Sequence, residues 1–194
     1  MPALARADHT RPDDIGSKAI EKLIGAGAHR EAVAFCAREY GATLGRLCMA
    51  LLGAQAEAEE AVQETLLAAH SGMASYRAEG TVKAWLYGIA RRICARRLET
   101  RIRRERRLVL VHDADADAEL PDDLLEARRR AERVRAALEE LKPSERDALL
   151  LRYESGLSYR EIGHACGLDE ATARKRASRA LEKLGDILGS KETR

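Results

Sequence analysis

The residues with the clearest chemical potential lie near the C-terminus, where basic side chains cluster from Arg174 to Lys183. A shorter helical pattern precedes them and ends at Gly167. Two short helices joined by a glycine turn indicate a helix-turn-helix, whose second helix presents its early residues to base edges in the major groove. Arg and Lys bind guanine O6 and N7 or hold phosphates. The early positions that we expect to face DNA are Glu170, Ala171, Arg174, Lys175, Arg176 and Arg179.

An ordinary basic helix of a bundle is the competing interpretation of this segment. Three features favour the helix-turn-helix. Ser158 and Glu161 have the spacing of a capping box, in which each side chain bonds to the other residue's backbone N–H. Gly167 suits the left-handed position that ends a helix. The third feature is the basic outer face itself, which lies opposite an apolar stripe rich in alanine.

Nucleophilic catalysis has little support in the sequence. His164 and Cys166 lie two positions apart on a predicted helix, so they do not face each other. A nucleophile needs a facing base and a third group that orients the base. The four cysteines are scattered without a CxxC motif, which favours reduced, partly buried thiols. The sequence contains no phosphate-binding glycine loop and no metal-ligand spacing. We therefore expect no catalytic residue, no metal, no cofactor and no enzyme.

The second half of the chain contains the helices that must position this motif. Apolar periodicity predicts a helix from about Asp123 to Leu141, and a second one that begins at Pro143 and stops at Gly156. A short helix follows over Tyr159–Cys166, and Asp169 caps the last one, which runs from about Glu170 to Leu188.

The first half predicts three longer helices. They run from about His29 to Leu52, from about Glu57 to His70 and from about Val82 to Arg107. Gly41 and Gly45 weaken the first helix and mark a kink or a break. Residues 71–81 are predicted to form a loop, and residues 1–25 a tail with a short helical turn.

Composition and charge set the class of protein and its partners. The net charge is only +2, so the clustered arginines, and not the total charge, indicate nucleic-acid binding. Aromatic residues make up 4% of the chain and charged residues 34%, which is typical of a helical, water-soluble protein. No apolar run is long enough to cross a bilayer, and no signal core is present. We expect a cytoplasmic protein with no direct membrane insertion.

The two halves of the chain resemble two conserved regions of bacterial RNA polymerase sigma factors of the extracytoplasmic-function type. The words similar to the fourth region are Leu141–Arg146 (LKPSER), Leu151–Tyr153 (LRY), Gly156–Ile162 (GLSYREI) and Gly167–Leu168 (GL). The words similar to the second region are Glu57–Thr65 (EAEEAVQET) and Ala84–Arg91 (AWLYGIAR). Their order, on either side of an acidic segment, strengthens the resemblance.

The resemblance implies a role for each region. The face formed by Glu57, Glu60, Gln63 and Glu64 is expected to bind core RNA polymerase. Residues expected to act at the −10 region of promoter DNA are Met73, Tyr76, Arg91, Arg92, Arg96 and Arg97. Trp85 is either a wall of the same base pocket or part of the core, and its apolar stripe favours the core. The C-terminal motif is expected to read the −35 region. Family members are commonly held inactive by an anti-sigma protein, which we expect as a further partner.

The family pattern is not matched everywhere. An aromatic residue is frequent where His70 and Val82 stand, Asn where Arg92 stands and Asp where Arg96 stands. The family's hydrophobic position in the recognition helix is here Ala173. These departures leave the class intact and concern the preferred promoter sequence.

We therefore predict an all-α protein of two small helical domains joined by a flexible acidic linker. The predicted parts are an N-terminal tail (1–25), a region 2-like domain (26–107), a linker (108–127) and a region 4-like helix-turn-helix domain (128–190). The acids of the linker either enter a basic channel of the polymerase or form a solvated spacer. The predicted function is an alternative sigma factor that directs core polymerase to promoters and helps open the −10 region. The alternative is a helix-turn-helix regulator that is not a polymerase subunit.

Overall fold

The computed structural model describes residues 13–107 and 122–192, and the predicted all-α fold is confirmed for them. These residues contain no strand. The described helices, in chain order, are α1 (Asp13–Gly25), α2 (His29–Leu52), α3 (Gln55–Gly72), the 3-10 helix η1 (Met73–Ser75), α4 (Val82–Arg107), α5 (Asp122–Glu139), α6 (Pro143–Tyr153), α7 (Tyr159–Cys166) and α8 (Glu170–Glu192).

Helices α1 to α4 form the first domain. Helix α2 packs along α3, and α4 closes the group against both of them. The core side chains lie on the helical stripes that the sequence predicted, since Cys36, Leu44 and Leu47 of α2 are all buried. Tyr40 and Tyr87 meet edge to face, with ring centroids 6.4 Å apart. The packing of α2, α3 and α4 against one another determines which faces of α3 and α4 remain exposed to solvent.

Helix α1 occupies part of the segment that we predicted as a tail. Ile20 is fully buried in the core of the first domain, and the Ser17 hydroxyl lies 3.3 Å from the Tyr40 hydroxyl. A segment of 25 residues rich in Gly, Pro and charge gave a weak helical signal, because its apolar stripe is only two turns long. Residues 13–25 therefore belong to the domain, and residues 1–12 lie outside the described part of the chain.

Helix α2 is continuous through both of its glycines, so the chain does not break there. A Cβ atom built on Gly41 or Gly45 meets nothing within 4 Å. These glycines therefore lower helix propensity without being required by packing.

Helices α5 to α8 form the second domain, in which α6 and α7 pack on one side of α8. Leu151, Leu157 and Ile162 are fully buried between these helices. Ala173, Ala177 and Ala180 give α8 a flat inner face that is also fully buried. Small residues on this face allow the helices to approach closely.

The local signals in the second domain are confirmed. Pro143 occupies the first turn of α6, where its missing N–H leaves no bond unmade. The Glu161 N–H donates to the Ser158 hydroxyl, and the Ser158 N–H donates to the Glu161 carboxylate, completing the capping box. Gly167 ends α7 with φ +68°, a left-handed conformation that glycine adopts without strain.

The two domains pack against each other, chiefly through α4 and α7 and to a lesser extent through α2 and α6. The predicted linker begins in residues outside the described part of the chain, and the structure resumes as helix at Asp122. Within the described ranges, no helix is both long enough and apolar enough to span a lipid bilayer.

Candidate nucleic-acid interface

Helix α8 begins with a side-chain cap that fixes its direction. The backbone N–H of Thr172 donates to Asp169 Oδ1 at 2.8 Å, and the Thr172 hydroxyl donates to Oδ2 at 2.6 Å. These bonds lower the pKa of Asp169, the hydroxyl contributing most, because both favour the ionised carboxylate. With the alanine face buried, the opposite face of α8 is held towards solvent.

The outer face of α8 carries most of the positions predicted to read the −35 region. Glu170, Ala171, Arg174, Lys175 and Arg179 are exposed, whereas Arg176 is partly buried. Glu170, Ala171, Arg174 and Lys175, together with Ser178, line one shallow depression on this face. The structure therefore groups the predicted residues on one exposed surface.

The cations of this face differ in how they are held. Arg174 pairs with Glu170 at 2.8 Å and lies over the ring of Tyr159, 5.1 Å from its centroid. Lys175 and Arg179 make no ion pair with any group in the described part of the chain. An exposed cation without an internal partner is available to a phosphate or a guanine edge.

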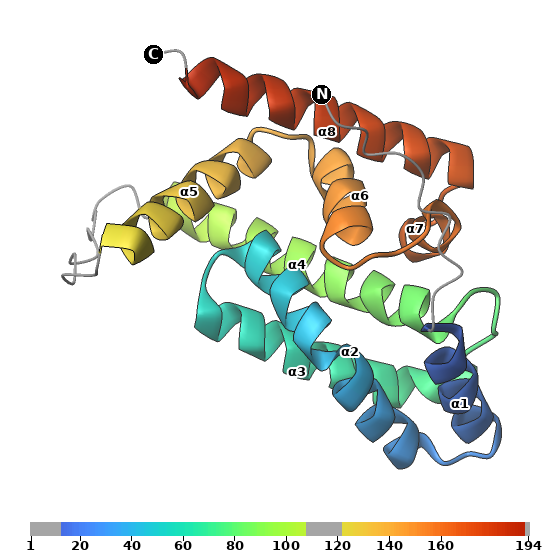
Figure 1. Cartoon of the computed structure of the whole chain (residues 1–194). Helices are drawn as coiled ribbons and strands as arrows, with labels where there is room; N and C mark the ends of the chain where they lie inside the picture. The colour runs from blue at the N-terminus through green and yellow to red at the C-terminus, as the bar shows by residue number, and fades with distance from the viewer. Residues whose placement is uncertain (1–12, 108–121, 193–194) are drawn as a thin grey trace.

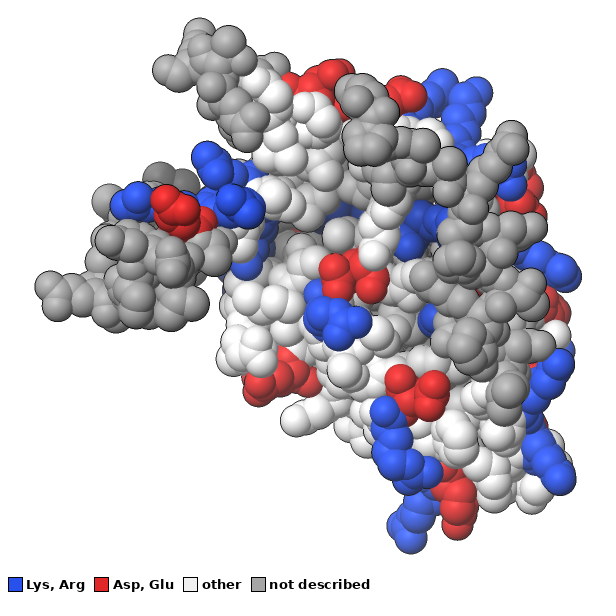
Figure 2. Space-filling model, viewed as in Figure 1, with Lys and Arg blue, Asp and Glu red and all other residues white. Residues whose placement is uncertain are grey.

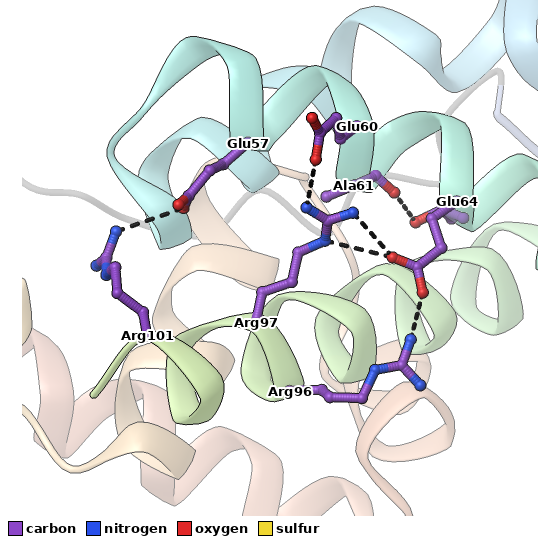
Figure 3. A network of polar contacts seen from close by, with 8 residues as sticks. Glu57, Glu60, Ala61, Glu64, Arg96, Arg97 and Arg101 are labelled. Atoms are coloured by element: carbon purple, nitrogen blue, oxygen red, sulfur yellow. Dashed lines mark hydrogen bonds and ion pairs between the residues drawn. The ribbon is translucent and has the colours of Figure 1, made fainter. Parts of the chain in front are cut away.

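The arginines of α4 are in a different situation, because carboxylates of the same chain hold four of them. Arg97 donates to Glu60 at 2.8 Å and to Glu64 at 3.1 Å, and Arg96 also pairs with Glu64 (Figure 3). Arg101 reaches Glu57 at 3.4 Å (Figure 3). Glu60 and Glu64, which are predicted to bind polymerase, thus form one network with Arg96 and Arg97, which are predicted to bind DNA.

The ion pairs of this network neutralise charges that both predicted sites would use. The pair with Glu60, followed by that with Glu64, raises the pKa of Arg97 despite partial desolvation, so its charge is internally neutralised. Glu57 and Glu64 are partly covered, whereas the Glu60 side chain stays 65% exposed. Exposed pairs of this kind contribute little to stability, about 0–1 kcal/mol each, so a partner can exchange with them at low cost.

Gln63 lies on a separate stripe of α3 that the arginines do not cover. Leu67, one turn further on, is 70% exposed, and His70 is also exposed. The sequence analysis did not assign Leu67 to either the buried or the exposed face of its helix. The exposed apolar surface at Leu67 was therefore not predicted. An exposed leucine next to a polar stripe is typical of a protein interface.

The residues predicted around the −10 pocket are only partly brought together. Met73 is 1% exposed and supports the loop from inside. The Tyr76 hydroxyl donates to the Gly80 carbonyl at 2.6 Å and lies 3.4 Å from a Glu21 carboxylate oxygen. Burial, and after it the Glu21 charge, raises the pKa of Tyr76. These two residues shape the loop.

A groove of about 410 Å³ lies between the exposed faces of α3 and α4. Trp85, Arg92 and Arg96 are among the residues that line it. The Trp85 ring lies 5.2 Å from the Tyr76 ring, and a Cβ on Gly72 would come within 3.1 Å of it. Trp85 is thus half-buried against Gly72 and still forms a groove wall, so both interpretations of this residue hold in part.

Arg91 is turned away from this groove. Its guanidinium pairs with Asp147 of α6 at 3.0 Å, and the two side chains are 22% and 11% exposed. Burial raises the pKa of Asp147, and the nearby Arg91 only partly opposes this effect. Sequence reasoning assigned Arg91 to DNA, because the helical pattern of α4 does not reveal which element covers it.

His164 and Cys166 do not form a catalytic pair. His164 is exposed and lies against Gly80 of the other domain. Burial raises the pKa of the Cys166 thiol, which disfavours the nucleophilic thiolate.

Charged groups of both signs lie beside one another on the face shown in Figure 2, in agreement with the low net charge. The fold and the site together define a class of protein: an all-helical DNA-binding protein with a capped helix-turn-helix and a second helical domain packed against it.

Comparisons with known proteins identify the family. Residues 36–107 match sigma-70 region 2, and residues 131–184 match sigma-70 region 4. The chain is 32% identical over 151 residues to the ECF RNA polymerase sigma factor EcfG of Rhodopseudomonas palustris (strain TIE-1), covering 75% of this chain and 79% of that one. The protein belongs to the extracytoplasmic-function (ECF) sigma factors of the sigma-70 family.

Two solved structures share the fold. One contains CnrH in complex with the cytosolic domain of CnrY, with a TM-score of 0.67, 19% identity and coverage of 90% of this chain and 98% of that one. The other contains the sigma factor RpoE in complex with the anti-sigma factor NepR from Bartonella quintana, with a TM-score of 0.57, 26% identity and coverage of 78% and 95%.

The predicted function is confirmed at the level of the family: this is an alternative sigma factor that acts with RNA polymerase in transcription initiation. Sigma factors are regulatory subunits of the polymerase. The alternative of a helix-turn-helix regulator outside the polymerase is not favoured, because the first half matches region 2 independently of the helix-turn-helix.

Proposed function

We propose that the outer face of α8 reads the −35 region of promoter DNA, with Lys175 and Arg179 making the leading contacts. The observation that carries this proposal is that these two cations are exposed on a capped recognition helix and lack an ionic partner in the described part of the chain. Arg176 and Arg174 support them, and Glu170 and Ala171 shape the approach to the bases.

The first domain has two tasks in this proposal. Glu60 and the neighbouring stripe of Gln63 and Leu67 on α3 bind core polymerase, since this surface combines an exposed carboxylate with an exposed apolar side chain. The groove between α3 and α4 takes a −10 base. Trp85 offers a stacking surface there, and Arg92 and Arg96 offer phosphate contacts.

We also propose that an anti-sigma protein binds this chain and that the chain acts in the cytoplasm. Support comes from the structural neighbour RpoE, which was solved with the anti-sigma factor NepR. Family membership supports the location, because the polymerase with which sigma factors act is cytoplasmic.

Run-off transcription with purified core polymerase and a library of genomic fragments tests this function. Start sites that depend on the protein are expected, and they give the promoter sequence. The double substitution Lys175→Ala with Arg179→Ala should reduce their use by roughly tenfold or more, since each base contact contributes about 1–3 kcal/mol. Binding to core polymerase should remain unchanged.

Arg30→Ala on α2 is the matched control, because it removes an exposed cation far from α8 in the sequence. It should transcribe like the unmodified protein. Equal loss of polymerase binding in the α8 variant would contradict the assignment of separate tasks to the two domains.

A further inference from the structure

The loop between η1 and α4 contains a residue in an uncommon backbone conformation. Ala78 has φ +53°, and among the described residues it is the only one other than glycine with a positive φ. A left-handed backbone brings the Cβ of an L-residue close to the following carbonyl oxygen, so it is less stable than a right-handed one. A residue of this kind keeps its conformation only when surrounding contacts hold it there.

The residues next to Ala78 do little to hold it. Its side chain is exposed, as are those of Arg77 and Glu79 on either side. Those two side chains approach each other only to 3.9 Å and are 82% and 75% exposed, so their attraction is weak. Within the described part of the chain, no backbone–backbone hydrogen bond involves residues 77–80. The bond that closes the loop comes instead from a side chain at its start.

The Tyr76 hydroxyl makes that bond. It donates to the Gly80 carbonyl oxygen at 2.6 Å and so joins the two ends of the segment that contains the left-handed residue. A Glu21 carboxylate oxygen of α1 lies 3.4 Å away, but a hydroxyl carries one proton, and the shorter distance assigns it to Gly80. Burial, followed by the Glu21 charge, raises the pKa of Tyr76, so the hydroxyl keeps this proton at neutral pH.

The Tyr76 ring connects the same loop to the groove between α3 and α4. It lies tilted against the Trp85 ring, with the ring centroids 5.2 Å apart. Trp85 lines the groove together with Ser75, which directly precedes Tyr76 in the chain. Without the bond to Gly80, Ala78 would be free to leave its left-handed conformation, and the ring that supports Trp85 would lose its anchor.

We propose that the Tyr76 hydroxyl is a positioning group for the −10 groove. Its bond to Gly80 holds Ala78 in the left-handed conformation, and the loop held in this way keeps Trp85 in place for stacking with an unstacked −10 base. Such preorganisation raises affinity, because less conformational freedom is lost on binding. This inference rests on the proposed function of the groove and adds two residues that prepare it without having to touch the DNA.

Tyr76→Phe tests the proposal in the full chain, because it removes the hydroxyl and keeps the ring beside Trp85. The probe is a fluorescein-labelled single strand with the −10 region of a promoter found by run-off transcription, bound by the holoenzyme and followed by anisotropy. We expect the affinity to fall about three- to tenfold, the range that one hydrogen bond contributes. In the free chain, acrylamide quenching of Trp85, the single tryptophan, should increase.

Ala78→Gly distinguishes positioning from a direct or merely structural role, because glycine adopts a positive φ without strain. By itself this substitution should leave the affinity and the quenching close to the unmodified values. Combined with Tyr76→Phe, it should restore most of the lost affinity and lower the quenching again. An equal loss from Tyr76→Phe with and without Ala78→Gly would overturn the proposal, since the hydroxyl would then act independently of Ala78.

Tyr153→Phe on α6 is the matched control, because it removes the hydroxyl of a tyrosine that is 55% exposed and whose hydroxyl makes no hydrogen bond within the described ranges. It should change neither measurement, and thermal unfolding checks that each variant is folded. Unchanged affinity and unchanged quenching in Tyr76→Phe overturn the proposal. If the unmodified holoenzyme binds the −10 strand no better than a scrambled strand, the proposed function of the groove is contradicted. The quenching then decides by itself whether Tyr76 positions Trp85.

Discussion

The basic residues of α4 and α8 carry the same charge but differ in how the rest of the chain uses it. On α4, Arg91, Arg96 and Arg97 are held by carboxylates of α6 and α3. On α8, Lys175 and Arg179 have no ionic partner in the described ranges. A run of arginines in a sequence therefore does not show by itself which of them the fold leaves available to DNA.

The difference also separates two kinds of binding. A surface with unpaired cations attracts phosphates directly, with a strong dependence on salt. A surface whose cations are already paired must exchange one partner for another, so its binding is conditional on a rearrangement. We infer that the second domain is ready to meet DNA and that the first becomes ready after polymerase binding.

The largest expected effect on stability comes from truncating one buried leucine in the core of each domain. Leu44→Ala in α2 and Leu151→Ala in α6 each remove a fully buried side chain and should cost about 2–5 kcal/mol of unfolding free energy. The single tryptophan, Trp85, lies in the first domain and reports its unfolding by fluorescence. Leu44→Ala should shift the fluorescence transition in urea strongly, and Leu151→Ala should shift mainly the circular dichroism signal.

If both variants shift the two signals equally, the domains unfold as one unit. The basic surfaces of α4 and α8 then belong to one cooperative unit. They differ only in whether their cations are paired with carboxylates.

A smaller effect is expected from removing one cation from each surface. Arg176→Ala on α8 should weaken promoter binding by the holoenzyme by about 1–3 kcal/mol and leave the affinity for core polymerase unchanged. Arg97→Ala on α4 should weaken it by less than about 1 kcal/mol, because Glu60 and Glu64 already neutralise this charge. Competition binding with labelled promoter DNA measures both.

Arg176 is partly buried, so thermal unfolding of both variants serves as the control for loss of structure. A larger loss for Arg97→Ala than for Arg176→Ala would reverse the comparison and make α4 the dominant DNA contact.

The smallest effect on stability is expected from releasing the α4 arginines. The double substitution Glu60→Gln with Glu64→Gln removes the partners of Arg96 and Arg97 and should change the unfolding free energy by less than about 1 kcal/mol. Binding of the chain to a single-stranded −10 oligonucleotide, followed by fluorescence anisotropy, should strengthen. The slope of log affinity against log salt should steepen by about 0.7 for each arginine released.

Gln63→Ala on the same helix is the control, since its side chain is exposed and lies on a different stripe from the ion pairs. An unchanged salt slope in the double variant contradicts the view that the carboxylates mask these arginines.

Most of the helices followed from local patterns. The predicted bounds of α4 and α7 agree with the structure, and the capping box at Ser158 and the left-handed Gly167 were predicted as such. These features depend on residues within one or two turns of each other, so the sequence contains the full signal. Helix α1 was the exception, because its helix depends on burying Ile20 against a distant core.

The candidate sites were predicted less completely than the helices. The exposed face of α8 was correctly located, since a buried alanine stripe leaves only one outward face. The ion pairs between α3 and α4 were not predicted, because periodicity shows which side of a helix is polar and does not show what lies opposite. Trp85 and Leu67 illustrate this, as their exposure depends on neighbouring helices.

The sequence by itself determined the helical class, the order of the helices, the helix-turn-helix and the family resemblance, because each of these depends on residue spacing along the chain. Only the tertiary structure decided which charges are available. The pairing of Arg91 with Asp147 and of Arg97 with Glu60 joins residues 56 and 37 positions apart. The physical reason is that an ion pair depends on distance in space and on local desolvation, and neither quantity is contained in helical periodicity.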